Sequence, residues 1–125
     1  MLTYIEENYK YMVNYQDAAQ NPIMWKRQGV QCDEGWYPLI KQMIDIISKL
    51  DIRKEVNIFQ IKEKFGTFRF YFNEQDVSNK YIKEVVDDFT IKINETCEWC
   101  GMPGTLVNNE ERCKTLCPVC DNMKD

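Results

Sequence analysis

Four cysteines near the end of the chain have the spacing of a metal-binding site. Cys97 and Cys100 form one Cys-x-x-Cys pair, and sixteen residues separate it from a second pair, Cys117 and Cys120. Two thiolates two residues apart can face one ion when the backbone between them turns tightly, and two such pairs complete a tetrahedral sulfur site. Gly101 follows the first pair, where the chain needs a positive φ. We therefore expect zinc as the cofactor, with these four cysteines as its ligands.

Other uses of the cysteines are open at this level. Two disulfides would require an oxidising compartment, and the first residues of the chain contain no apolar signal segment. Cys113 is close enough in sequence to replace a ligand, although its spacing to Cys117 suits a metal-binding turn less well. Cys32 is distant, and we expect it to be a small, partly buried residue. A site of four thiolates has no open coordination position, which indicates structural rather than catalytic zinc.

The composition argues against several classes of function. The 125 residues carry a net charge of −4, so binding to nucleic acid would need a local basic patch. The chain has no histidine, which removes the most common general base and the catalytic triads that use it. We interpret acidic pairs such as Asp33-Glu34 and Asp87-Asp88 as solvated surface or helix caps. No nucleotide-binding glycine motif or small-molecule substrate site is evident, so we expect a protein that is not an enzyme.

Hydrophobic periodicity predicts three helices, over residues 3–20, 37–50 and 76–96. The first carries several tyrosines, which we interpret as amphipathic packing in preference to a contact surface. The second is a core helix with a broad apolar stripe. The third has Asp76 or Ser78 as its candidate N-cap and Tyr81 in its buried stripe. It runs directly into Cys97, which predicts that the cysteines are attached without a flexible linker.

Residues 55–73 are the most informative stretch outside the cysteines. Two runs rich in β-branched and aromatic residues predict a β-hairpin that turns at Phe65-Gly66. Counting outward from that turn pairs Lys64 with Thr67 and ends with Phe59 opposite Phe72. One face of this hairpin is apolar and is expected to be buried on the helices; it carries Phe59, Ile61, Phe68, Phe70 and Phe72.

The other face of the predicted hairpin is the one locally basic segment of an acidic chain. It carries Lys62, Lys64, Arg69 and Tyr71, with Lys62 directly opposite Arg69. A like-charged pair of this kind is destabilising by roughly a few tenths of a kcal/mol. These residues form a candidate binding face for phosphate or for an acidic partner, with Tyr71 available to stack. The alternative, which we favour at this level, is a solvated surface whose charges pair with neighbouring carboxylates.

Four stretches together resemble a family of small, largely uncharacterised zinc-binding proteins encoded by phages and prophages. The stretches are GWYPLI at 35–40, IKEKFG-x-x-RFY at 61–71, CExCGxPG at 97–104 and TLCxxC at 115–120. In the family pattern a cysteine or histidine occupies the position of Cys120, and Cys113 is not part of the pattern. The resemblance implies a zinc-bearing α+β protein made inside a bacterial cell, and it brings no established activity.

These observations predict an α+β fold in which a β-hairpin sheet packs on two to three helices. Residues 1–96 form this core, and residues 97–125 form a four-cysteine zinc module of treble-clef or ribbon type, packed on the core as one compact unit. No stretch is long and apolar enough to cross a membrane. We therefore expect the protein in the cytoplasm of the bacterial host cell.

The expected function is non-catalytic binding to another protein. A specific version of this hypothesis is the inhibition of a host enzyme or of an anti-phage defence complex. The alternative is a nucleic-acid-binding zinc module that uses the basic hairpin face. The identity of the partner and the oligomeric state do not follow from the sequence.

Overall fold

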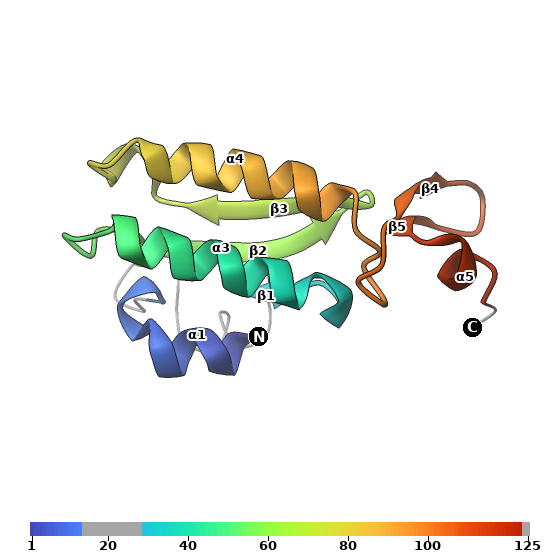
Figure 1. Cartoon of the computed structure of the whole chain (residues 1–125), viewed down its shortest axis with the longest axis horizontal. Helices are drawn as coiled ribbons and strands as arrows, with labels where there is room; N and C mark the ends of the chain where they lie inside the picture. Colours follow the sequence, from blue (N-terminus) through green and yellow to red (C-terminus); the bar gives the residue numbers. More distant parts are fainter. Residues whose placement is uncertain (14–28, 124–125) are drawn as a thin grey trace.

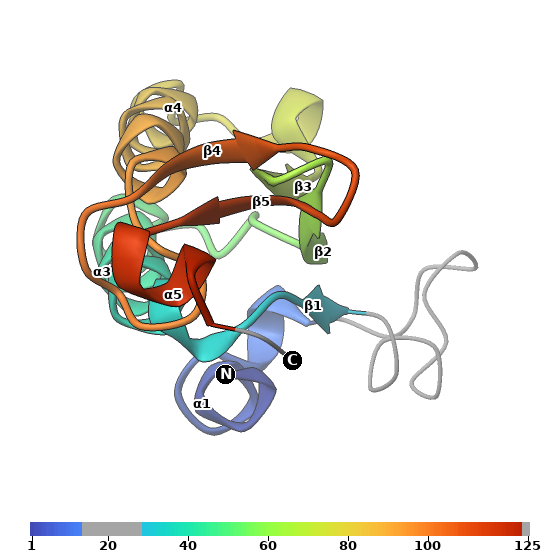
Figure 2. The same cartoon turned by 90° about the vertical axis from the view of Figure 1, so that its right-hand side faces the viewer.

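The computed structural model describes residues 1–13 and 29–123, which form a sheet covered by helices. The sheet has three strands in the order β1-β2-β3, and Figures 1 and 2 show the helices on one of its faces. Strand β1 is parallel to β2, and β2 is antiparallel to β3. The strands are β1 (Val30–Gln31), β2 (Ile58–Lys64) and β3 (Thr67–Phe72). The predicted α+β fold is confirmed.

Two long helices cover the sheet and supply most of the core. They are α3 (Tyr37–Leu50), which has the predicted bounds, and α4 (Tyr81–Asn94). Their buried residues are Ile40, Met43, Ile44 and Ile47 of α3, and Ile82, Val86, Phe89 and Ile93 of α4. These side chains pack against buried residues of the sheet, among them Ile58, Ile61 and Phe68. Each such burial contributes about 1.5–3 kcal/mol, so this layer dominates the stability of the fold.

The first helix is shorter than predicted. Helix α1 (Leu2–Asn8) is followed by a short 3-10 helix (Lys10–Met12), so the predicted continuous helix from residue 3 is wrong. The hydroxyl of Tyr9 donates to Asp45 on α3, and that of Tyr11 donates to Asp51 at the end of α3. Positions two residues apart point to different sides of an α-helix, so the break allows both hydroxyls to reach α3. The tyrosines at positions 4, 9 and 11 thus pack on α3, and residues 14–20 of the predicted helix lie outside the described residues.

The third helix starts later than the predicted residue 76. A 3-10 helix (Glu74–Asp76) comes before it. A similar 3-10 helix (Glu34–Trp36) leads into α3. Ser78 donates its N–H and its hydroxyl to the Glu55 carboxylate, at 3.1 and 3.0 Å. The N-cap position of α4 is Lys80, so the prediction of Asp76 or Ser78 as the cap is wrong. The Asn79 side chain accepts the Tyr81 N–H instead. Tyr81 is 67% exposed, so its predicted place in the buried stripe is wrong.

The β2–β3 hairpin has the predicted register on the turn side of Gln60. Lys64 pairs with Thr67, which leaves Phe65 and Gly66 as a two-residue turn. Their φ angles are 54° and 81°, and positive φ at both positions is the signature of the type I′ turn that matches the strand twist.

A register shift at the far end of the hairpin corrects one predicted pair. Between Ile58 and Gln60 the register slips, so that Phe72 pairs with Ile58 and not with Phe59. Ile58 is fully buried, whereas Phe59 is only partly buried. The bulge therefore turns Ile58 into the core, and the prediction that Phe59 lies opposite Phe72 is wrong.

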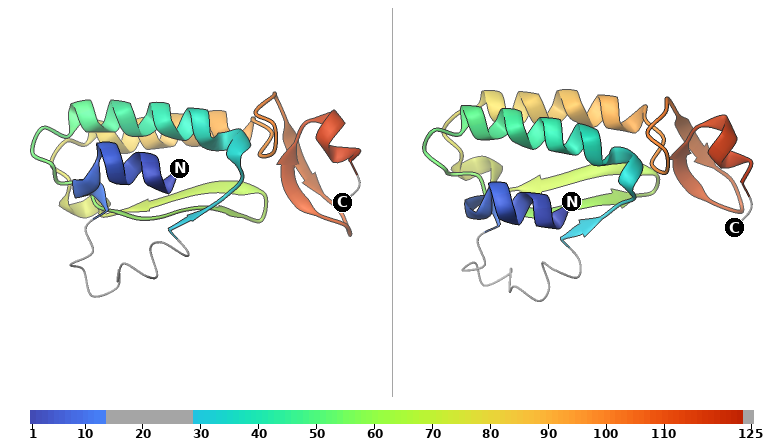
Figure 3. Two further views of the ribbon diagram at one scale, coloured as in Figure 1. Left: turned by 90° about the horizontal axis from the view of Figure 1, so that it is seen from below. Right: turned by 60° about the horizontal axis from the view of Figure 1, so that its bottom comes forward.

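The four-cysteine unit, residues 96–123, lies at one end of the layered body (Figures 1 and 3). It contains the hairpin β4 (Thr105–Asn108) and β5 (Cys113–Leu116), followed by the short helix α5 (Pro118–Asp121). The hairpin thus lies between the two cysteine pairs, and the second pair leads into the short helix. In the described part of the chain, no helix is long and apolar enough to span a membrane.

Candidate metal centre

Four cysteine sulfur atoms converge in the four-cysteine unit. The Sγ atoms of Cys97, Cys100, Cys117 and Cys120 all lie within 4.8 Å of one another. Bonds of about 2.3 Å in a tetrahedral site place sulfur atoms about 3.8 Å apart, which is close to this spacing. All six cysteines are free thiols, so no disulfide competes for them. The cluster can therefore hold a metal ion.

Backbone hydrogen bonds shape the first cysteine turn. The Cys97 N–H donates to the Met102 carbonyl at 2.7 Å, and the Gly101 N–H donates to the Cys97 carbonyl at 3.0 Å. Gly101 has a φ of 85°, a conformation that glycine adopts without strain. The turn closes tightly because of these bonds, and it brings the sulfur of Cys100 beside that of Cys97.

The second cysteine pair begins helix α5. Cys117 is the N-cap residue, and its sulfur accepts a hydrogen bond from the Cys120 N–H at 3.4 Å. Pro118 stands at the first helical position, where its missing N–H costs no helical bond. The Cys117 sulfur also lies 3.5 Å from that of Cys100, which joins the two pairs.

The thiols of the cluster differ in acidity. Burial raises the pKa of Cys97, but hydrogen bonds from the N–H groups of Cys117, Cys100 and Trp99 outweigh it and lower this pKa to about 7. Burial and the neighbouring thiols raise the pKa of Cys120 above its ordinary value. Cys97 is therefore the first of the two to ionise. A bound cation would displace the protons that the other thiols retain.

The two remaining cysteines do not join the cluster. Cys113 lies on β5 opposite Asn108 and is half-buried. Cys32 is half-buried against the main core, as predicted. Burial, together with the charges of Glu98 and Asp33, raises the pKa of Cys32 to about 12, which leaves it a poor nucleophile.

The cysteines of the cluster also form most of the core of their unit. The buried residues are Cys97, Cys117, Cys120 and Leu116, and Trp99 and Val107 pack against them. Such a cluster buries too little apolar surface to hold the unit by itself, so bonds to a metal would supply folding free energy. Four thiolate ligands would also fill the coordination sphere of the metal, which favours a structural role for the metal over a catalytic one.

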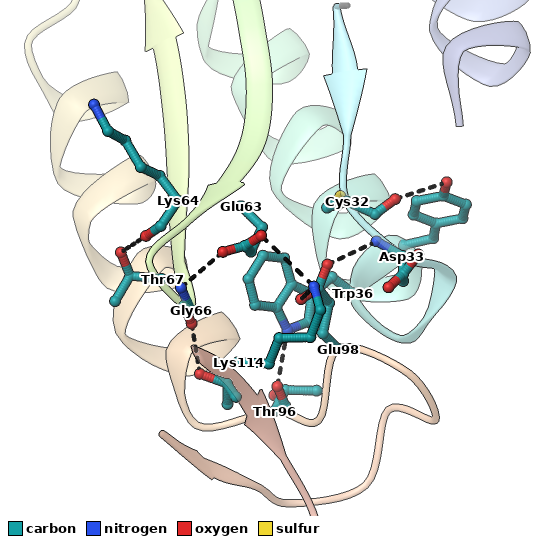
Figure 4. Close-up of polar contacts among 12 residues, drawn as sticks. Cys32, Asp33, Trp36, Glu63, Lys64, Gly66, Thr67, Thr96, Glu98 and Lys114 are labelled. Atoms are coloured by element: carbon teal, nitrogen blue, oxygen red, sulfur yellow. Dashed lines mark hydrogen bonds and ion pairs between the residues drawn. The ribbon is translucent and has the colours of Figure 1, made fainter. Parts of the chain in front are cut away.

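Glu98 ties the four-cysteine unit to the layered body (Figure 4). Its side chain is 1% exposed and accepts bonds from the Asp33 N–H at 3.0 Å and from Lys114 Nζ at 3.3 Å. Lys114 also lies 3.6 Å from Glu63, whose carboxylate accepts the Gly66 N–H at 2.7 Å. Burial raises the pKa of Glu98, and the Asp33 N–H and the Lys114 charge offset this only in part. This chain of contacts connects the first cysteine turn to the hairpin turn.

Backbone contacts close the same junction. The Gly35 N–H donates to the Glu98 carbonyl at 2.8 Å, and a Cβ on Gly35 would lie 2.4 Å from the carbonyl oxygens of Cys97 and Glu98. Trp36 is fully buried and donates its indole N–H to the Thr96 carbonyl at 2.8 Å. The close approach of Gly35 to the carbonyl oxygens of Cys97 and Glu98 leaves no room for a side chain, so position 35 requires glycine.

Sequence reasoning missed this junction. Each of the four stretches that carry the family resemblance contributes to it, through Gly35, Glu63, Glu98 and Thr115 respectively. The sequence pattern gives no sign that Glu63, Glu98 and Lys114 form a group, because these residues are distant from one another along the chain. The available signal was Glu98, an acidic residue placed between two cysteines that must themselves carry negative charge to bind metal.

The candidate binding face is on the side of the sheet opposite the buried Ile61 and Phe68, because successive side chains of a strand alternate between its two faces. Lys62 and Arg69 are cross-strand neighbours; Lys62 is half-buried, and Lys64 and Arg69 are exposed. Tyr71 is 43% exposed on the same face. Within the described residues, the side chains of Lys62 and Arg69 make no ion pair or hydrogen bond. The pairing with neighbouring carboxylates that we favoured from the sequence is therefore not found in the described part of the chain.

Comparisons with protein-family models, with curated proteins and with solved structures found no match to this chain. The fold and the cysteine cluster define its class as a small α+β protein with a four-cysteine cluster that can hold a metal ion, at one end of a two-layer body. Its function must be inferred from the geometry of its own surfaces.

Proposed function

We propose that this chain is a non-catalytic zinc protein that binds another protein through the open face of its sheet. The observation that carries the proposal is the opposed pair of Lys62 and Arg69. Like charges opposite each other on neighbouring strands are destabilising by about 0.2–1 kcal/mol. No carboxylate in the described residues pairs with either side chain. An acidic partner surface would supply the missing counter-charges.

Zinc is the metal that best fits the donor set. Tetrahedral sites of four thiolates favour zinc or iron–sulfur chemistry, and the two-residue spacing within each cysteine pair is typical of structural zinc. Reduced thiols persist in the cytoplasm, so we place the protein in the cytoplasm of a bacterial host cell. A chain without histidine and with a filled metal coordination sphere is better suited to binding than to catalysis.

The resemblance to phage-encoded proteins supports a partner from the host. We propose that this partner is a host enzyme or an anti-phage defence complex, which the protein inhibits by occupying a surface. The basic face then defines the complementary surface, which must be acidic. Such complementarity gives specificity and speeds association more than it raises affinity.

Nucleic-acid binding by the same face is the second candidate. It is favoured by Tyr71, which is 43% exposed beside the cations and available to stack on a base. Lys62, Lys64 and Arg69 are fewer than the about six to ten phosphate contacts common in duplex binding. The net charge of −4 also opposes long-range attraction. A protein partner therefore ranks first.

A tagged pull-down from the bacterial host, with and without nuclease and at two salt concentrations, separates the candidates. The baits are the wild type, the double variant K62E/R69E and the control K49E/R53E, which makes the same charge change at exposed residues outside the sheet. The proposal expects a stoichiometric protein that survives nuclease and high salt, is lost with K62E/R69E and is kept by the control. Nucleic acid that is lost at high salt would establish the second candidate, and recovery of no protein would contradict the first.

A further inference from the structure

The turn of the β2–β3 hairpin presents an exposed phenylalanine in a strained backbone conformation. Phe65 has a φ of 54° and is 71% exposed. Two-residue turns of this type favour asparagine followed by glycine, because a bulky residue at positive φ crowds its own backbone. The ring lies outside the core, and the Lys64 ammonium is 5.8 Å from the ring centre. Folding of the hairpin therefore does not explain why phenylalanine occupies this position.

The four-cysteine unit holds this turn in place (Figure 4). The Gly66 N–H donates to Glu63 at 2.7 Å, and the Gly66 carbonyl accepts the Thr115 hydroxyl at 2.7 Å. Glu63 is in turn paired with Lys114 at 3.6 Å. Both peptide groups of Gly66 are thus fixed by residues outside the turn. A ring presented on a rigid turn loses little conformational entropy when it enters a pocket.

The surroundings of Phe65 indicate the chemistry of a partner. Leu106 of β4 is 51% exposed, and its Cδ1 lies 2.4 Å from the position of a Cβ on Gly66, so it extends the apolar tip. Lys64 is exposed, its ammonium lies 5.8 Å from the centre of the Phe65 ring, and it begins the candidate binding face. An aromatic and an aliphatic side chain therefore stand next to a row of cations that have no carboxylate partner among the described residues.

We infer that Phe65 is the apolar anchor of the interaction, inserting into a pocket of a second protein whose rim carries carboxylates. The inference rests on the proposed function and adds the part of the surface that dominates the affinity. Exposed aromatic residues in the centre of an interface commonly dominate binding. The acidic rim follows from charge complementarity to Lys64 and to the cross-strand pair of Lys62 and Arg69.

The variant F65N separates anchoring from folding. Asparagine is favoured at the first position of this turn, so the substitution removes the ring and relieves the backbone strain. We expect F65N to melt at a higher temperature than the wild type and to bind the partner at least about tenfold more weakly. The control Y81N removes another exposed aromatic side chain, on α4, and should leave binding unchanged.

The probe is the protein recovered stoichiometrically on the wild-type bait, purified and titrated calorimetrically against each variant. Weaker binding and a raised melting temperature in F65N, with no change of affinity in Y81N, support the anchor. Unchanged affinity in F65N overturns the anchor and leaves the proposed function intact. A lowered melting temperature in F65N would assign the ring a structural role, and this result also overturns the proposed anchor. Self-association that F65N abolishes would replace the second protein by another copy of this chain, and recovery of no protein would contradict both proposals.

Discussion

Replacing Gly35 with alanine adds one methyl group where the four-cysteine unit meets the layered body. The new Cβ would lie 2.4 Å from the carbonyl oxygens of Cys97 and Glu98, whereas ordinary contact begins at 3.4 Å. One backbone segment must therefore move by about 1 Å, the difference between these distances. Backbone atoms cannot rotate aside as a flexible side chain can, so we expect the junction to open.

The expected loss follows from the contacts at that point. The bond from the Gly35 N–H to the Glu98 carbonyl, 2.8 Å long, contributes about 1 kcal/mol. The bond from the Asp33 N–H to the Glu98 carboxylate, 3.0 Å long, contributes about 1.5–3 kcal/mol because its acceptor is charged. Overpacking adds about 1–3 kcal/mol. We expect G35A to lower the free energy of unfolding by about 3.5–7 kcal/mol, a large share of the about 5–15 kcal/mol of a typical domain.

The assay is denaturant unfolding at fixed zinc, followed by circular dichroism and tryptophan fluorescence. Cobalt absorption checks the metal centre, which should persist in G35A because all four ligands lie within residues 97–120. The control E34A changes the exposed neighbour of Gly35 and should shift the free energy by no more than about 0.5 kcal/mol. A G35A protein within about 1 kcal/mol of the wild type would refute the reasoning.

Three further perturbations test other parts of the molecule. Trp36→Phe should lower the free energy of unfolding by about 2–4 kcal/mol in denaturant titrations, because the Thr96 carbonyl loses its indole donor and a cavity opens. Cys100→Ser, or a chelator added to the wild type, should reduce zinc binding in a competition assay and unfold the four-cysteine unit while the helical signal of the body remains. In a spectrophotometric pH titration Tyr4, through its bond to a carboxylate of α3, and Tyr11, through burial, should ionise above the ordinary pKa of 10.0. Because these folded-state pKa values are raised, their contribution to stability is complete below about pH 10 and is lost as the pH rises further; ionisation at the ordinary pKa would contradict the hydrogen bonds.

Local rules were sufficient for the hairpin turn and for the clustering of the cysteines. A two-residue turn at Phe65 and Gly66 fixes the strand register beside it, because each pair follows from the last. The two residues between Cys97 and Cys100 similarly allow only a tight turn. The bulge beside Phe59 did not follow from counting, since it is set by the packing of Ile58 into a core made by distant helices.

Long-range contacts account for the errors and for what the sequence did not reveal. Ser78 binds Glu55, 23 residues earlier, and the helix begins only at Tyr81, so Ser78 does not occupy the N-cap position. The junction was hidden for the same reason, since Glu98 meets the backbone of Asp33 across 65 residues. Propensity and periodicity describe near neighbours, so neither can show that a charged residue has a buried partner.

The bond between Gly66 and Thr115 also has a consequence for biosynthesis. The two residues are 49 positions apart. At about 5–20 residues per second, a ribosome needs about 2–10 s to add the intervening chain. During that interval the nascent hairpin lacks the hydroxyl and the Lys114 ammonium that later fix its turn. The turn at Phe65 and Gly66 therefore gains these contacts only after residues 114 and 115 have been added to the chain.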